Sequence, residues 1–307
     1  MRDVLFWRGV FAVLGAVVVL VVARATRRWL AVLAIPLLVV GGYLLWYTNR
    51  TPPDPLKRTI REGVVYERSV VDGAVFHKLE IDLKTPGLTW LGTPADTSGG
   101  RQAIARTTTQ FAEELDAAVA VNTAYFAPWH SNTLLDYYPH VGDPVDCIGA
   151  TTTNGVRVSP YDPNLVSLWV APDGTLAIDD RDHPDARFVW SGFWLVDSST
   201  IAKPVRGTAA TQRHPRTAAG LTRGGDRLIL VVVDGRQPSY SDGAAFEPLA
   251  RWMIAAGAHD AVLFDGGGTT SMVARDWGAD VLLNPPVHGR HPPGLERPVA
   301  CHLGLRF

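Results

Sequence analysis

One seven-residue segment of the chain combines an acidic side chain, three glycines and three hydroxyl groups: Asp265-Gly266-Gly267-Gly268-Thr269-Thr270-Ser271. It follows the apolar run Ala261–Phe264, which predicts a buried strand that ends at the acid. Glycines let a backbone approach a ligand closely and turn N–H groups toward an anion, and hydroxyl groups add donors. The segment therefore predicts an anion site beside a carboxylate; a tight turn that needs positive φ is the alternative. No Lys follows the glycines, so a Walker loop is excluded.

A second acid stands at the end of another apolar run. Asp234-Gly235-Arg236 follows Leu228–Val233, and we expect this strand end to be a neighbour of Asp265 in one sheet. Arg236 can pair with Asp234, or it can bind a phosphate through its planar guanidinium. An Asp-Gly turn with a surface Arg is the alternative interpretation.

Other polar side chains stand where predicted strands begin or end. Asn122 ends the apolar run Ala118–Asn122, and Arg216-Thr217 opens the run to Leu221. Glu296-Arg297 lies just before the last strand, Val299–Phe307, and we interpret the Glu as an ion-pair partner. The sequence predicts that these guanidinium, amide and hydroxyl groups join the anion site.

The long stretch from Thr123 to Thr153 has no regular pattern but is rich in aromatic, His and Asp residues. Loops of this length in compact domains are usually functional or disordered, and the aromatic content argues against disorder. The aromatic rings can stack on a sugar or pack in the core; both interpretations stay open for Trp129, Tyr137 and Tyr138. The spacing of His130, His140 and the acids matches no standard metal site. We expect no cofactor, with a divalent metal not excluded.

The elements that position these groups are mostly strands. Three hairpins are predicted, each with a Gly-containing turn between alternating or apolar runs. They comprise Val64–Val71 with Val75–Leu83, Val166–Val170 with Leu176–Ile178, and Arg216–Leu221 with Arg227–Val233. Apolar residues at helical spacing predict helices over Ala103–Leu115 and Phe246–Ala256. The fold class predicted is α+β, with a mixed β-sheet and a few helices.

The N-terminal segment differs from the rest of the chain in composition and charge. Of its first 50 residues, 35 are hydrophobic, and the segment carries a net charge of +5 against −6 for the remainder, which sums to −1. Val4–Ala23 and Trp29–Tyr47 are each close to the roughly 20 residues that cross a bilayer as a helix. Residues 1–50 thus predict a two-helix transmembrane hairpin, with the lipid bilayer as partner through residues 4–47. A cleaved signal peptide is the alternative for the first run, although no small-residue cleavage site follows it.

The arginines between the two runs favour the cytoplasmic side for the link, which places everything after Tyr47 outside the cytoplasm. Residues 51–60, which begin Thr51-Pro52-Pro53-Asp54-Pro55, predict a stiff linker, and residues 61–307 form the soluble domain. An acidic body with no basic run argues against nucleic acid as a partner. Cys147 and Cys301 can form a disulfide outside the cytoplasm, but the sequence does not show their proximity.

Taken in order along the chain, these motifs resemble the phosphodiester glycosidase family from about Val64 to the C-terminus. The resemblance rests on six segments: Asn122–Phe126, Pro215–Gly220, Asp234–Arg236, Asp265–Thr269, Asn284 and Arg297–Ala300. It implies a hydrolase that separates a sugar from the phosphate of a sugar-1-phosphodiester. From the chemistry of the residues we expect Asp265 first and Asp234 second as catalytic carboxylates. The residues expected to bind substrate or phosphate are Asn122, Arg216, Thr217, Arg236, Gly266, Gly267, Gly268, Thr269 and Arg297.

The reaction implied by this resemblance agrees with the residue chemistry. A phosphate leaving group is already anionic and needs cationic stabilisation more than a strong acid, while the sugar cation needs a nearby carboxylate. We therefore expect a membrane-anchored, extracytoplasmic hydrolase acting on a surface or envelope glycan or glycolipid. A non-catalytic glycan-binding module and a metal-dependent phosphodiesterase that cuts the P–O bond are the alternatives.

Overall fold

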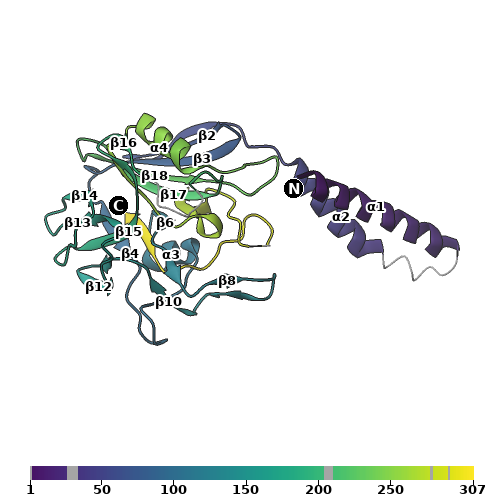
Figure 1. The fold of residues 1–307 in the computed structure, drawn as a ribbon, viewed down its shortest axis with the longest axis horizontal. Coiled ribbons are helices and arrows are strands. Elements are labelled where there is room, and N and C mark those ends of the chain that lie inside the picture. The colour runs from purple at the N-terminus through teal and green to yellow at the C-terminus, as the bar shows by residue number, and fades with distance from the viewer. Residues whose placement is uncertain (1, 26–33, 204–209, 277–278, 290) are drawn as a thin grey trace.

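In the computed structural model, two N-terminal helices project from one end of a β-rich domain (Figure 1). The structure describes residues 2–25, 34–203, 210–276, 279–289 and 291–307. The helices are α1, Arg2–Ala25, and α2, Ala34–Asn49. They lie side by side, and glycines allow the close approach: a Cβ on Gly41 would come within 3.0 Å of the Gly9 carbonyl oxygen.

The outer surface of this helix pair is apolar. Window Leu5–Val22 of α1 has a mean hydropathy of 2.4, and by length and composition it can cross a membrane. The described part of α2 is 16 residues long, shorter than the roughly 20 residues of a full span. The predicted second span starts at Trp29, and residues 29–33, together with Arg27 and Arg28 of the link, lie outside the described residues. Two adjacent helices are thus observed, while a membrane hairpin stays a prediction.

Two antiparallel sheets pack face to face in the domain. The larger has the order β1-β2-β3-β18-β17-β19-β15-β11-β12, with β13, β14 and β16 attached to it. The smaller has the order β21-β20-β6-β22-β4. Side chains of both, among them Leu230, Val262, Val121 and Leu303, form one buried core. The packing of two apolar sheet faces explains why the central strands of the sheets are almost completely buried.

The strands of the larger sheet are β1 Leu56–Arg61, β2 Val64–Val71, β3 Ala74–Asp82, β11 Thr151–Thr153, β12 Val156–Ser159, β13 Val166–Val170, β14 Leu176–Asp179, β15 Phe188–Asp197, β16 Thr200–Ile201, β17 Arg216–Leu221, β18 Arg227–Val233 and β19 Asp260–Leu263. Those of the smaller sheet are β4 Thr89–Gly92, β6 Val119–Asn122, β20 Met272–Asp276, β21 Ala279–Leu282 and β22 His302–Arg306. Short strands outside these sheets are β5 Ala103–Ile104, β7 Phe126–Ala127, β8 His130–Ser131, β9 Tyr137–Tyr138 and β10 Pro144–Cys147.

A helix covers the outer face of each sheet, so the domain has four layers (Figure 1). Helix α4, Phe246–Ala255, packs Leu249 and Met253 against the larger sheet. Helix α3, Thr108–Leu115, packs Phe111 against the smaller one. The α+β class and all three predicted hairpins are confirmed.

Four expectations about the elements were wrong. The sheet is not mixed, because every pairing between the named strands is antiparallel. The first domain helix begins at Thr108 rather than Ala103, because Thr107 caps it through a capping box with Gln110 and the preceding residues form β5. The linker is shorter than residues 51–60, since β1 already pairs with β2. The long stretch 123–153 is not irregular but holds five short strands.

Candidate active site

The ends of three neighbouring strands meet at one edge of the larger sheet. β17 lies between β18 and β19 and is antiparallel to both. The carboxyl ends of β18 and β19 lead to Asp234 and Asp265. They therefore lie at the same end of the strands as Arg216, which begins β17. The two acidic strand ends are in one sheet as expected, but they are separated by β17 rather than adjacent.

A pocket of about 350 Å³ opens at this edge. Six of the eleven predicted residues line it: Arg236, Asp265, Gly266, Gly267, Gly268 and Arg297. Its remaining walls are less polar and consist of Tyr125, Phe126, Trp129 and Ile148. A polar floor with one carboxylate and an apolar, aromatic wall suit a ligand that carries both an anion and a ring.

Asp265 is the carboxylate of this pocket. Burial raises the pKa of its side chain to about 7, against the opposing effects of Arg297, of the Gly266 N–H, of Thr269 and of Arg236. Its Oδ1 accepts a hydrogen bond from the Gly266 N–H at 2.9 Å. A carboxyl group with such a pKa is divided between its two protonation states near neutral pH, which is the range that suits a general base.

Two guanidinium groups lie directly on the glycine segment. A Cβ added to Gly267 would lie 2.9 Å from Arg236 Nη2, and one on Gly268 would lie 2.6 Å from Arg297 Nη2. Gly267 also has a φ of +69°, which L side chains rarely adopt. The glycines are thus needed because they leave room for two cations beside Asp265.

This arrangement corrects the expected role of the glycine N–H groups. The Gly266 N–H is bonded to Asp265, and the Gly267 N–H donates to the Pro215 carbonyl oxygen at 2.8 Å. These two amides are therefore committed within the protein and do not point at a ligand. The positive charge of the pocket comes from the arginines.

Arg297 is the more buried of the two cations, with 9% of its surface exposed. Its guanidinium carbon lies 5.1 Å from the centre of the Trp129 ring, a cation–π contact. Burial lowers its pKa and Asp265 raises it. Throughout the described ranges, no carboxylate lies within 4.0 Å of its nitrogens. A buried guanidinium without a direct ion pair is costly, so it is suited to receive an anion from a ligand.

Arg236 is held by its neighbours on the other side of the pocket. It has a φ of +59° and directs its Nε and Nη2 toward His214 Nδ1 at 3.4 and 3.3 Å. Burial, Arg236 and Arg216 lower the pKa of His214, so the neutral imidazole can accept these hydrogen bonds. The His ring thus positions Arg236 without neutralising its charge.

Asn122, Thr217 and Thr269 hold the glycine segment from behind. The Asn122 amide donates to the Asp265 carbonyl oxygen at 2.8 Å, and its Oδ1 accepts from the Thr217 hydroxyl at 2.8 Å. The Thr269 hydroxyl donates to the Gly266 carbonyl oxygen at 2.9 Å. All three are buried and absent from the pocket lining, so they position the segment rather than touch a ligand.

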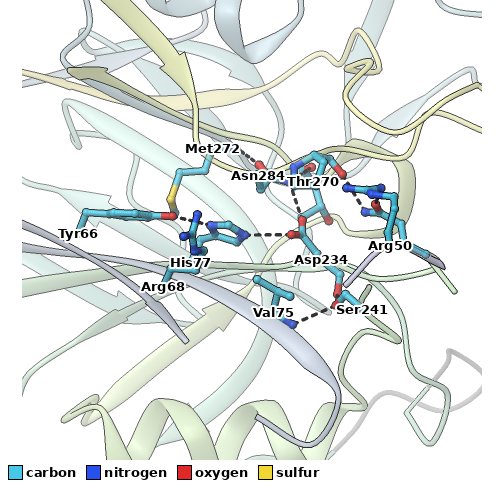
Figure 2. A network of polar contacts seen from close by, with 12 residues as sticks. Arg50, Tyr66, Arg68, Val75, His77, Asp234, Ser241, Thr270, Met272 and Asn284 are labelled. Atoms are coloured by element: carbon cyan, nitrogen blue, oxygen red, sulfur yellow. Dashed lines mark hydrogen bonds and ion pairs between the residues drawn. The ribbon is translucent and has the colours of Figure 1, made fainter. Parts of the chain in front are cut away.

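Asp234 lies in a buried polar network behind the pocket (Figure 2). Its Oδ2 is 2.9 Å from His77 Nε2, and the His77 ring is 2.8 Å from the Tyr66 hydroxyl. Its Oδ1 accepts from Asn284, which also donates to the Thr270 carbonyl oxygen. With 1% of its surface exposed, Asp234 is not placed to contact a ligand. The expectation of two carboxylates in the pocket is corrected, because the sequence shows two acidic strand ends but not which side chain turns inward.

Arg216 and Glu296 are also turned away from the pocket lining. Arg216 Nε donates to the Ala244 carbonyl oxygen at 3.1 Å and Nη2 to the Gln212 carbonyl oxygen at 3.3 Å. Glu296 accepts from Ser271 Oγ and from the N–H and hydroxyl of Thr109 in the first turn of α3. Glu296 thus fixes a helix end, and it makes no ion pair in the described part of the chain.

Four pocket residues were not among the predicted site residues: Tyr125, Phe126, Trp129 and Ile148. The sequence allows Trp129 either to stack on a sugar or to pack in the core, and Tyr125 and Phe126 belong to the motif after Asn122. No signal in the sequence separates these three from core residues. The Cys147–Cys301 disulfide is formed. It joins the strand before Ile148 to the end of the Arg297 loop. Among the described residues, no group of three or more His, Cys, Asp or Glu side chains could hold a metal ion.

Comparison with known proteins agrees with this site. The family model of the phosphodiester glycosidases matches residues 116–306, which include the whole pocket, and the chain belongs to this family. Comparison with curated protein sequences gave no match.

Two solved structures share the fold. One is the zebrafish N-acetylglucosamine-1-phosphodiester α-N-acetylglucosaminidase catalytic domain auto-inhibited by its pro-peptide, with a TM-score of 0.59 and 19% identity over 85% of this chain and 86% of that one. The other is a hypothetical protein from Synechocystis, with a TM-score of 0.56 and 14% identity over 82% of this chain. The present chain covers 64% of the Synechocystis protein.

Proposed function

We propose that the protein is a membrane-anchored glycosidase that cleaves a sugar-1-phosphodiester between the anomeric carbon and the phosphate. The observation that supports this most directly is the pair of guanidinium groups beside a single carboxylate. Arg236 and Arg297 can bind the phosphate and stabilise the charge that it gains on leaving. The sugar ring then lies against the Trp129 and Tyr125 wall, as carbohydrate rings do against aromatic faces.

In this proposal Asp265 faces the positive charge that develops at the sugar C1. Its ionised form stabilises that charge and can take the proton of the attacking water. No second carboxylate lines the described pocket, and the leaving phosphate does not require an acid. Asn122, Thr217 and Thr269 hold Asp265 and the glycines in place, and Asp234 supports the adjoining strand end.

The anchor in this proposal is the apolar helix pair, with the domain on the extracytoplasmic side. A disulfide in the domain is consistent with an oxidising compartment. The positive link residues support the same orientation, because positively charged loops stay in the cytoplasm.

Hydrolysis in ¹⁸O-labelled water tests the reaction directly. Purified full-length protein in detergent is given a panel of sugar-1-phosphodiesters, starting with the N-acetylglucosamine diester that the name of the zebrafish relative suggests. Label in the released sugar supports C–O cleavage. Label in the phosphate means a phosphodiesterase, and binding without release means a glycan-binding module; either result refutes the proposal. Asp265→Asn should abolish release while leaving the fold intact.

A further inference from the structure

The end of the anchor is bonded directly to the pocket wall. Tyr47, in the last turn of α2, donates a hydrogen bond from its hydroxyl to the carbonyl oxygen of Arg236 at 3.0 Å. Ser239 donates from its hydroxyl to the Thr48 carbonyl oxygen at 2.8 Å. Because Arg236 lines the pocket, one hydrogen bond separates a pocket residue from an aromatic residue at the end of the apolar helix.

Arg50 fixes the same junction after the helix has ended. Its guanidinium donates to Gln237 Oε1 at 2.6 Å and lies over the Tyr240 ring at 4.2 Å. Gln237 is 1% exposed and donates in turn to the Pro285 carbonyl oxygen at 2.9 Å. The domain therefore rests on the end of α2 through several contacts, and the short Pro-rich segment that follows does not separate the two.

A second apolar element lies at the same end of the domain. The β8–β9 hairpin carries Leu134 and Leu135 at its tip, 49% and 91% exposed. Figure 1 shows this hairpin at the end from which α1 and α2 project. Trp129, 58% exposed, connects the hairpin to the pocket. Two adjacent exposed leucines at a loop tip are unfavourable in water and favourable in a bilayer interface.

A groove adjoins the pocket and includes the residue that is bonded to the end of α2. It has a volume of about 610 Å³, and its walls include Arg213, His214, Arg236 and Ser239. Arg236 belongs to both the groove and the pocket, whereas Ser239 is the residue bonded to α2. A phosphodiester bound at Arg236 can therefore have its sugar side in the pocket and its other side in the groove, whose wall includes Ser239, the residue bonded to the anchor.

From these contacts we infer that the Leu134–Leu135 tip rests in the bilayer that the anchor crosses, and that the aglycone of the substrate is a membrane lipid. The inference rests on the proposed glycosidase function. Water adds to C1 and the C1–O bond breaks with its electron pair going to the phosphate oxygen. One water proton passes to Asp265 and then to solvent. The products are the free sugar and a lipid phosphomonoester.

The position of the tip can be measured without any activity. Both cysteines of the chain are in the disulfide, so Leu135→Cys introduces one thiol that takes an NBD fluorophore. In full-length protein reconstituted in phosphatidylcholine–phosphatidylglycerol vesicles, we expect a blue shift and quenching by spin-labelled acyl chains. Val156→Cys is the matched control, since Val156 is 57% exposed and lies on β12 at the other end of the domain. Equal, weak quenching at both positions would overturn the bilayer contact.

The substrate class is tested with hexadecyl and methyl diesters of the same sugar 1-phosphate in those vesicles. We expect kcat/KM for the hexadecyl diester to exceed that for the methyl diester by about tenfold or more. The double variant Leu134→Ser, Leu135→Ser should lower the ratio of kcat/KM for the hexadecyl diester to that for the methyl diester by about tenfold. Turnover of the methyl diester should stay unchanged. Val156→Ser should change neither.

The outcomes separate the two proposals. Equal rates on both diesters, unaffected by the serine variant, would refute a lipid aglycone while the glycosidase stands. Failure to cleave either diester would refute the proposed function, and the quenching experiment would still decide the bilayer contact.

Discussion

Replacing Asp265 by Asn should stabilise the protein at neutral and higher pH, by an amount that the surroundings of the carboxyl group determine. Burial raises its pKa from 3.8 to about 7. Between these values the unfolded chain releases the proton and the folded chain retains it, so wild-type stability falls as pH rises from about 4 to about 7. Above pH 7 no further loss follows, because both states are then ionised.

The size of the effect follows from the same numbers. At about 1.4 kcal/mol per pKa unit, the difference corresponds to about 4 kcal/mol at full burial. The carboxyl group opens onto the pocket, where water screens it, so we expect about 2 kcal/mol. Asn is nearly isosteric and keeps an acceptor for the Gly266 N–H. For a domain of this size that free energy raises the unfolding midpoint by about 4–8 °C.

The assay is thermal unfolding of wild type and Asp265→Asn between pH 4 and pH 9, in the same detergent. The stabilisation by Asn should be near zero at pH 4 and reach its full value above about pH 8. Asp173→Asn is the control, because hydrogen bonds to Thr175 lower the pKa of Asp173 and its variant should not gain stability as pH rises. A difference between wild type and Asp265→Asn that does not change with pH would refute the reasoning.

Four further outcomes follow from the site. Because Asp265 must be ionised, kcat/KM should rise tenfold per pH unit below about pH 7 and level off above it; a profile that falls across this range would contradict the assignment. Arg297→Ala should lower kcat/KM by about 10²–10³ without lowering the unfolding midpoint, and equal activity of the variant would exclude phosphate binding there. Gly268→Ala should displace the Arg297 guanidinium and lower kcat/KM by a factor similar to that of Arg297→Ala. The free energy of unfolding should change little, since the displaced group is the end of a flexible side chain. Replacing Cys147 and Cys301 together by Ala should cost about 2–5 kcal/mol, measured by urea unfolding, and an unchanged midpoint would show that the disulfide does not stabilise the fold.

Local patterns were sufficient to predict much of the fold. The hairpins around Asp72-Gly73 and Pro172-Asp173-Gly174 could be predicted because turn chemistry and alternation are local properties. The helix at Phe246 could be predicted because its apolar face repeats at helical spacing. The predicted start of α3 was wrong. The apolar spacing and the capping box at Thr107 are both local signals, and the capping box sets where the helix begins.

The site was only partly predictable for a different reason. Asp234 and Asp265 look alike in sequence, each an acid before glycine at the end of an apolar strand. Which of them faces the pocket depends on neighbours far along the chain: His77 and Asn284 enclose Asp234, whereas Arg236 and Arg297 stand beside Asp265.

By itself the sequence determined the α+β class, the apolar N-terminal segment, the order of the family motifs and the glycine segment after Asp265. These depend on residue type and spacing within short windows. Only the tertiary structure decided that the glycines make room for arginines, that one carboxylate lines the pocket among the described residues, and that Tyr47 at the end of α2 is bonded to the pocket wall. Those features depend on contacts between residues up to 189 positions apart, and such contacts form only when the sheets pack and bring distant strand ends to one edge.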